Sequence, residues 1–416
     1  MSGKNNKYYE ITLVLLLALA LGMSVLCRLE VVFLFPLIKE SFKLTYTDLG
    51  AFTLIIAIAV ALSSWFAGAL TDQFGKKIIL LPSIIVFSLL SWLSGITQNF
   101  FQMFITRGFL GLGVGALMPP SVAAIWMESK PERRGFNFGL HQAAIPLVAI
   151  AFGSIITTQL ASVMSWRAVL GVLGIPGVIL CIILYFYMRE PQIKKTSENT
   201  SPKPEPGKIK DEISIRKIPF FMPLKYKNVL ISSIVAPCEF SSFFIITAFG
   251  ISYLTEILHL PMKEAGFLMS FLGIGGFLGS IILPHLSDYV GRKPVIVTSL
   301  FLMAAIIFII YGSGPNFLKL SVLFILGGFF PGGIAPIAVS ALTTEDCPPE
   351  FAGASSAIPI AFGEIVGGAL MPYIAGCFSD IYDLKTAILI AGILPVLGGL
   401  ASFFYKETAP KITLGK

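Results

Sequence analysis

Charged and polar side chains interrupt several long apolar stretches of this 416-residue chain. A charge inside an apolar segment is costly, and where a membrane surrounds the segment such a charge usually serves a function. The residues that stand out in this way are suited to binding an anion and to moving a proton. They are Arg28, Glu30, Arg107, His141, Gln142, Glu239 and Glu364.

The two arginines are the candidate ligands for an anion. A guanidinium group offers a planar fork of donors that matches a carboxylate or a phosphate. We therefore predict that Arg28 and Arg107 bind substrate. For Arg107 a structural role is also open, in which the side chain donates hydrogen bonds to carbonyls of the first helix and packs beside glycines.

The carboxylates are the candidate proton carriers. A carboxylate that loses its hydrating water is favoured in its protonated form, so it can take up a proton near neutral pH. We predict this role for Glu239 and Glu364. Glu30 is a weaker candidate, because it lies two residues from Arg28 and so points to another helix face. Each carboxylate could instead be a structural partner of an arginine.

Two polar residues of the fifth apolar segment are predicted to contact substrate. They are His141 and Gln142, and an imidazole could also relay a proton. The alternative for His141 is that it only lines the inner part of a cavity.

The same sequence argues against an enzyme. The five cysteines show neither metal-ligand spacing nor a paired framework. No nucleophile and base stand in a recognisable arrangement, so we expect no metal site and no cofactor.

The elements that must position these residues are membrane-spanning helices. Only 13% of the residues are charged, against 55% hydrophobic, and soluble domains carry about a quarter charged residues. A spanning helix needs about 20 mostly apolar residues, and twelve segments qualify. They are approximately 9–37, 48–71, 77–98, 101–127, 135–160, 166–189, 228–257, 263–287, 294–313, 317–343, 351–378 and 384–405. The fold class is thus an all-α membrane protein.

A polar, proline-containing stretch over 190–227 divides these segments six and six. Its composition is typical of a flexible linker, which predicts an N-terminal bundle over 1–189 and a C-terminal bundle over 228–416. Placing both termini in the cytoplasm puts most of the 30 Lys and Arg residues on the inside, as the positive-inside rule requires. The net charge of +7 then reflects topology and contact with anionic lipid, and nucleic-acid binding is not expected.

An internal repeat connects the two halves. After the second span the chain reads Gly68-Ala-Leu-Thr-Asp72-Gln-Phe-Gly75-Lys76-Lys77, and after the eighth it reads Pro284-His-Leu-Ser-Asp288-Tyr-Val-Gly291-Arg292-Lys293. Pro131-Glu132-Arg133-Arg134-Gly135 after the fourth span matches Pro349-Glu350-Phe351-Ala352-Gly353 after the tenth, at an offset of 218. Such repeats are typical of transporters that rock two halves about a central site.

Over nearly its whole length the chain resembles the major facilitator superfamily. The loop signature of that family, G-x-x-x-D-R-x-G-R-K, is present with Gln73 in place of the usual Arg. Its fourth-helix signature R-x-x-x-G-x-G-x-G is present as Arg107, Gly111, Gly113 and Gly115. The resemblance implies two pseudo-symmetric six-helix bundles, alternating access, and a central cavity lined by the first and fourth helices, where Arg28 and Arg107 are expected to converge.

The repeated loops are predicted to form a latch on the cytoplasmic side. The resemblance places Asp72 near the N-terminus of the eleventh helix, whose dipole would stabilise the carboxylate, and Gly75 permits the tight turn. Lys76 and Lys77 are expected to pair with Glu128. The alternative is that these lysines only anchor the topology. The full set is Gly68, Asp72, Gly75, Lys76, Lys77, Glu128, Arg134, Asp288, Gly291, Arg292 and Lys293.

A narrower resemblance concerns the first helix. Arg28 followed by Phe35-Pro36-Leu37-Ile38 is similar to the anion:cation symporter branch, which carries organic acids, although Cys27 stands where that branch often has Asp. This implies a proton-coupled symporter for a small carboxylate, acting as a monomer in the cell membrane. The alternative is a proton-coupled exporter. It is less favoured because Pro146 is followed by Leu147-Val148-Ala149-Ile150, without the glycine pair of the antiporter signature.

Overall fold

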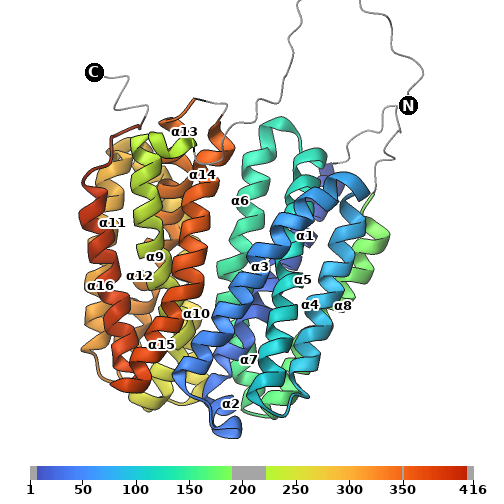
Figure 1. Cartoon of the computed structure of the whole chain (residues 1–416), viewed down its shortest axis with the longest axis vertical. Helices are drawn as coiled ribbons and strands as arrows, with labels where there is room; N and C mark the ends of the chain where they lie inside the picture. Colours follow the sequence, from blue (N-terminus) through green and yellow to red (C-terminus); the bar gives the residue numbers. More distant parts are fainter. Residues whose placement is uncertain (1–6, 190–221, 349–350, 410–416) are drawn as a thin grey trace, which may run out of the picture.

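The computed structural model describes residues 7–189, 222–348 and 351–409. Twelve helices in this part of the chain are long and apolar enough to cross a membrane, as predicted. They form two bundles of six that lie side by side (Figure 1). The predicted linker over 190–227 lies mostly outside the described residues, and its last part forms the short helix η3 (Met222–Lys225).

The first bundle begins and ends at one end of the molecule. Its elements are α1 (Lys7–Phe33), α2 (Phe35–Phe42), α3 (Tyr46–Phe74), α4 (Lys76–Ser94), α5 (Phe100–Glu128), η1 (Pro131–Arg133), α6 (Arg134–Ala144), η2 (Ile145–Phe152), α7 (Gly153–Ala161) and α8 (Trp166–Tyr187).

The second bundle repeats this order. Its elements are α9 (Lys227–Ser252), η4 (Tyr253–Ile257), α10 (Met262–Val290), α11 (Arg292–Tyr311), α12 (Phe317–Ala335), η5 (Pro336–Ala341), α13 (Leu342–Glu345), α14 (Ala352–Phe362), η7 (Gly363–Leu370), α15 (Met371–Ile381) and α16 (Lys385–Ser402). We name the end at which α1 begins and α16 ends the terminal face, and the opposite end the α2 face (Figure 1).

The repeat is visible in local backbone geometry. The fifth span of each bundle contains a π-helical segment, η2 over 145–152 and η7 over 363–370, at the offset of 218 found in the sequence. The single-residue turns after the second spans are also equivalent. Gly75 has a φ of 96° and Gly291 a φ of 116°, a region that costs little only for glycine.

The first span differs from its predicted extent. A single helix over 9–37 was expected, but α1 ends at Phe33 and α2 starts at Phe35. Pro36 stands in the first turn of α2, where its missing N–H does no harm at a helix start but would break a continuous helix. The chain therefore bends before it reaches the α2 face.

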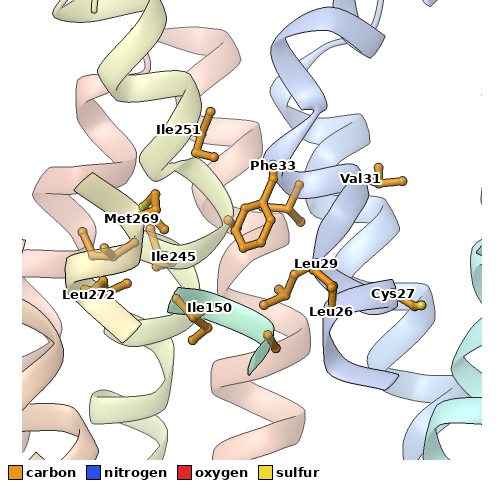
Figure 2. Packing of buried hydrophobic residues seen from close by; sticks show 14 of the residues in the cluster. Leu26, Cys27, Leu29, Val31, Phe33, Ile150, Ile245, Ile251, Met269 and Leu272 are labelled. Atoms are coloured by element: carbon orange, nitrogen blue, oxygen red, sulfur yellow. The ribbon is translucent and has the colours of Figure 1, made fainter. Parts of the chain in front are cut away.

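Buried apolar side chains join the two bundles near the molecular centre. Leu26, Leu29 and Phe33 of α1 point toward Ile150 of η2 and Ile245 of α9 (Figure 2). All five are at most 7% exposed. In lipid, close packing of this kind rather than exclusion of water holds helices together.

Glycines allow the closest helix contacts. A Cβ atom at Gly275 would collide with the carbonyl oxygen of Ile325, and one at Gly279 with that of Phe329. Small residues at such positions let helix backbones touch. Gly275 and Gly279 therefore determine how closely α10 crosses α12. This crossing also affects where α10 lies against η2 of the other bundle.

Candidate functional site

A narrow pocket between the bundles contains the predicted anion ligand Arg28. Both bundles line it, because α1 and α3 provide one wall and α9, η7 and α15 the other. The lining residues are Arg28, Leu29, Val32, Thr53, Ile56, Phe244, Thr247, Ala248, Gly368 and Pro372. Thr53 lies seven residues from the start of α3, or about 10 Å along the helix. The pocket therefore lies beneath the α2 face.

Arg28 is held between a carboxylate and an aromatic ring. Its Nη1 lies 3.9 Å from Oε2 of Glu364, and its side chain is 12% exposed. The guanidinium carbon lies 5.1 Å from the centre of the Phe244 ring, within the range of a cation–π interaction. The structure thus brings together two of the residues predicted from the sequence, Arg28 and Glu364, from opposite bundles.

Glu239 of α9 is a second acidic side chain that interacts with Glu364. It is 3% exposed, and its Oε2 atom has no hydrogen-bond partner among the described residues. Its carboxyl group interacts electrostatically with that of Glu364. A buried carboxyl group beside a second carboxyl group is costly to charge.

Arg107 does not meet Arg28 in a common cavity. Its side chain is fully buried, and both Nη atoms lie 3.2 Å from Oε1 of Glu30. Nη1 also donates to the Cys27 carbonyl at 2.8 Å, and Ser91 donates to the other oxygen of Glu30 at 3.0 Å. The expected convergence of the two arginines is therefore wrong for this conformation. The structural alternative, a bond to carbonyls of the first helix, matches the geometry.

His141 and Gln142 occupy different environments on α6. His141 is fully buried, and neither ring nitrogen has a hydrogen-bond partner in the described part of the chain. Gln142 is exposed. Neither lines the pocket around Arg28, and their predicted contacts with substrate stay predictions.

The loop between α10 and α11, at the terminal face of the second bundle, forms a charge network. Arg292 pairs with Asp288 at 3.0 Å and with Glu345 at 2.6 Å. The backbone N–H groups of Arg292 and Lys293 donate to Glu407 at 2.9 and 3.1 Å. Glu345 and Glu407 were not predicted, although both stand in short polar segments at the ends of spans.

The equivalent loop of the first bundle differs. In this conformation the Lys77 amine donates to the Met188 carbonyl at 3.2 Å and lies over the Tyr185 ring, and the expected pairing of Lys76 and Lys77 with Glu128 stays a prediction. Helix α8 ends beside the loop and provides this acceptor. The side chain of Asp72 lies outside the described part of the structure, and its predicted role stays a prediction.

Two further residues of the predicted latch lie in different surroundings. The guanidinium carbon of Arg134 lies 4.0 Å from the centre of the Trp126 ring. A Cβ atom at Gly68 would meet nothing within 4 Å, so this face of α3 is uncovered.

Polar contacts that the sequence did not reveal join the bundles at the α2 face. Lys39 Nζ lies 2.7 Å from Glu256, and the Tyr46 hydroxyl donates to the same carboxylate at 2.6 Å. Asp380 accepts hydrogen bonds from the backbone N–H groups of Tyr46 and Thr47, both at 2.8 Å. These two N–H groups are the first of α3, so a carboxylate of the second bundle caps a helix of the first.

Comparison with known proteins identifies the family of this fold. A sequence profile of the Major Facilitator Superfamily matches residues 12–358 and 231–415. The cis,cis-muconate transport protein of Acinetobacter baylyi is 28% identical over 382 residues, 86% of this chain and 87% of that protein. The hexuronate transporter of Bacillus subtilis is 26% identical over 312 residues, 72% of each chain. The probable 4-methylmuconolactone transporter of Cupriavidus pinatubonensis is 26% identical over 274 residues, which cover 64% of this chain and 60% of that protein.

Solved structures have the same fold. A bacterial homologue of the human lysosomal transporter Spinster superposes with a TM-score of 0.76 at 14% identity, covering 96% of this chain and 98% of that one. The nucleoside transporter NupG superposes with a TM-score of 0.75 at 15% identity, covering 96% and 100%. The chain therefore belongs to the Major Facilitator Superfamily, and it is a multi-pass membrane transporter rather than an enzyme.

Proposed function

We propose that this protein moves a small organic anion of the carboxylate type across the cell membrane by alternating access, in symport with a proton. The observation that carries the proposal is Arg28, a guanidinium in a pocket between the bundles whose ionic partner is a half-exposed carboxylate. Relatives whose names include muconate and hexuronate support an organic acid as substrate.

Substrate and proton are coupled because the substrate carboxylate and Glu364 compete for Arg28. The substrate carboxylate takes the guanidinium and displaces Glu364, whose separation of 3.9 Å from Arg28 is longer than a strong charge-assisted bond. Glu364 then stands beside Glu239 without a cation, and repulsion between the two carboxyl groups favours uptake of a proton. Substrate and proton therefore occupy the site together.

The positive-inside rule places the terminal face in the cytoplasm, with both termini inside. The polar contacts of Lys39, Glu256 and Asp380 then close the outer end of the transporter. Breaking those contacts then opens the site to the outside.

The test is uptake of radiolabelled carboxylates into proteoliposomes with an imposed inward proton gradient. The wild-type protein is expected to accumulate at least one acid, and accumulation should collapse when a protonophore dissipates the gradient. Arg28→Ala should lower uptake about a hundredfold, because one charge-assisted bidentate contact contributes about 3 kcal/mol.

Lys319→Ala serves as the matched control, because it removes one positive charge from an exposed position at the start of α12. Uptake by Arg28→Ala equal to that of the control would exclude the anion site. Wild-type accumulation that is insensitive to the proton gradient would exclude proton symport.

A further inference from the structure

The pocket around Arg28 offers few free polar groups to a ligand. Beside Arg28, the polar side chains that line it are Thr53 and Thr247. The Thr53 hydroxyl donates to the Gly50 carbonyl at 2.7 Å, and the Thr247 hydroxyl donates to the Phe243 carbonyl at 2.8 Å. Both hydroxyl protons are thus used within their own helices, and the remaining lining side chains are apolar.

One wall of the pocket is aromatic and positioned by a glycine. Phe244 of α9 packs against Phe240 and Phe243, with ring centroids 6.3 and 5.8 Å apart. A Cβ atom at Gly368 would lie 3.2 Å from the Phe244 ring and 3.0 Å from the Glu364 carboxylate. The absence of a side chain at Gly368 therefore lets Phe244 and Glu364 both reach the Arg28 guanidinium.

We propose that Phe244 is a specificity-determining residue, and that the site prefers a planar carboxylate with an aromatic or conjugated body over a polyhydroxylated sugar acid. This inference rests on the proposed organic-anion function. Arg28 takes the carboxylate while the planar body lies against the Phe244 ring, an arrangement that aromatic groups favour. The hydroxyl groups of a sugar acid would lose their water here without finding partners.

The experiment compares uptake of benzoate and of D-glucuronate by purified protein in proteoliposomes. The wild-type protein should favour benzoate by about tenfold or more in kcat/KM. Phe244→Leu should reduce this preference about threefold to tenfold, mainly by raising the KM for benzoate. Phe244→Tyr keeps the ring and should restore most of the preference.

Phe271→Leu is the matched control, because it removes a ring of the same bundle that packs against Phe317 and does not line the pocket. Its benzoate preference should equal that of the wild type. Transport of glucuronate as efficiently as benzoate, or a preference unchanged in Phe244→Leu, would overturn the inference while leaving the proposed function intact. Transport of neither these acids nor any other carboxylate of the panel would instead refute the proposed function.

Discussion

At the scale of single residues, the buried pair of Arg107 and Glu30 holds the first helix around the candidate anion ligand. Arg107 bonds the carbonyl of Cys27 and the side chain of Glu30, on either side of Arg28. Both partners are fully buried, so each charge depends on the other. The pair is therefore suited to fix the depth and rotation of α1 at Arg28.

Removing one member of this pair should be far more harmful than removing both. Arg107→Leu or Glu30→Leu alone leaves a buried charge unpaired and should cost about 3–5 kcal/mol of stability. The double variant leaves no unpaired charge and should recover much of that loss. Thermal unfolding of the purified protein in detergent measures the three variants, with Lys319→Ala as a control of similar change in charge.

A double variant as unstable as either single one would contradict this account of the pair. Transport by the double variant separates the two roles that were open for Arg107. If it folds and still transports with a normal KM, Arg107 does not bind substrate.

At the scale of elements, the same turn in each bundle is closed by different partners. Gly75 and Gly291 make equivalent left-handed turns, as their spacing in the sequence predicted. Around them, Arg292 binds Glu345 of α13, whereas Lys77 binds the end of α8. Backbone geometry followed the repeat, and side-chain pairing followed the local neighbours.

Glu407, which accepts hydrogen bonds from the start of α11, makes the stability of this region depend on pH. Burial opposes ionisation of Glu407, but hydrogen bonds from the backbone N–H groups of Ala409, Arg292, Lys293 and Thr408 outweigh it and lower its pKa below the ordinary 4.5. A carboxylate with a lowered pKa stabilises the folded state above its unfolded pKa, and this contribution is lost as the pH falls through the folded pKa.

Glu407→Gln should therefore reduce thermal stability at neutral pH. The difference from wild type should begin to shrink as the pH falls below the unfolded pKa of about 4.5, and it should vanish once the pH is below the lowered folded pKa, where the wild-type carboxylate is protonated as well. Unfolding temperatures measured across this range test the prediction, with the exposed Glu40→Gln as control. A difference that stays constant with pH would show that charge at Glu407 is not the cause.

At the scale of the whole molecule, polar contacts join the two bundles at the α2 face. Asp380 caps the start of α3 across the bundle interface, and Glu256 gathers Lys39 and Tyr46. These contacts lie between the pocket and the α2 face. They must therefore break before a ligand can enter the pocket from the α2 face. Conformational exchange and access to Arg28 are thereby connected.

Asp380→Asn should shift the population toward the state closed at the terminal face. An exposed charged cap contributes about 1 kcal/mol, which corresponds to about a fivefold change in the ratio of the two states. Electron–electron resonance between spin labels at Gln73→Cys and Gly353→Cys, with the native cysteines replaced, should show a larger short-distance fraction.

The control is Asp383→Asn, an exposed carboxylate near the same face that bonds Thr386 of its own bundle. It should leave the distance distribution unchanged. An equal shift in both variants would attribute the effect to surface charge rather than to the cap of α3.

The sequence by itself determined the twelve spans, the repeat and the glycine turns, because these depend on the length of apolar segments and on backbone freedom at single residues. It also marked Arg28, Glu239 and Glu364 as functional candidates, because charges within apolar spans are rare. Only the tertiary structure decided that Arg28 faces Glu364 and Phe244 while Arg107 is bound to Glu30. Only the tertiary structure likewise showed that Asp380 caps the start of α3. Partners of this kind depend on the rotation and depth of each helix, which packing between distant segments sets.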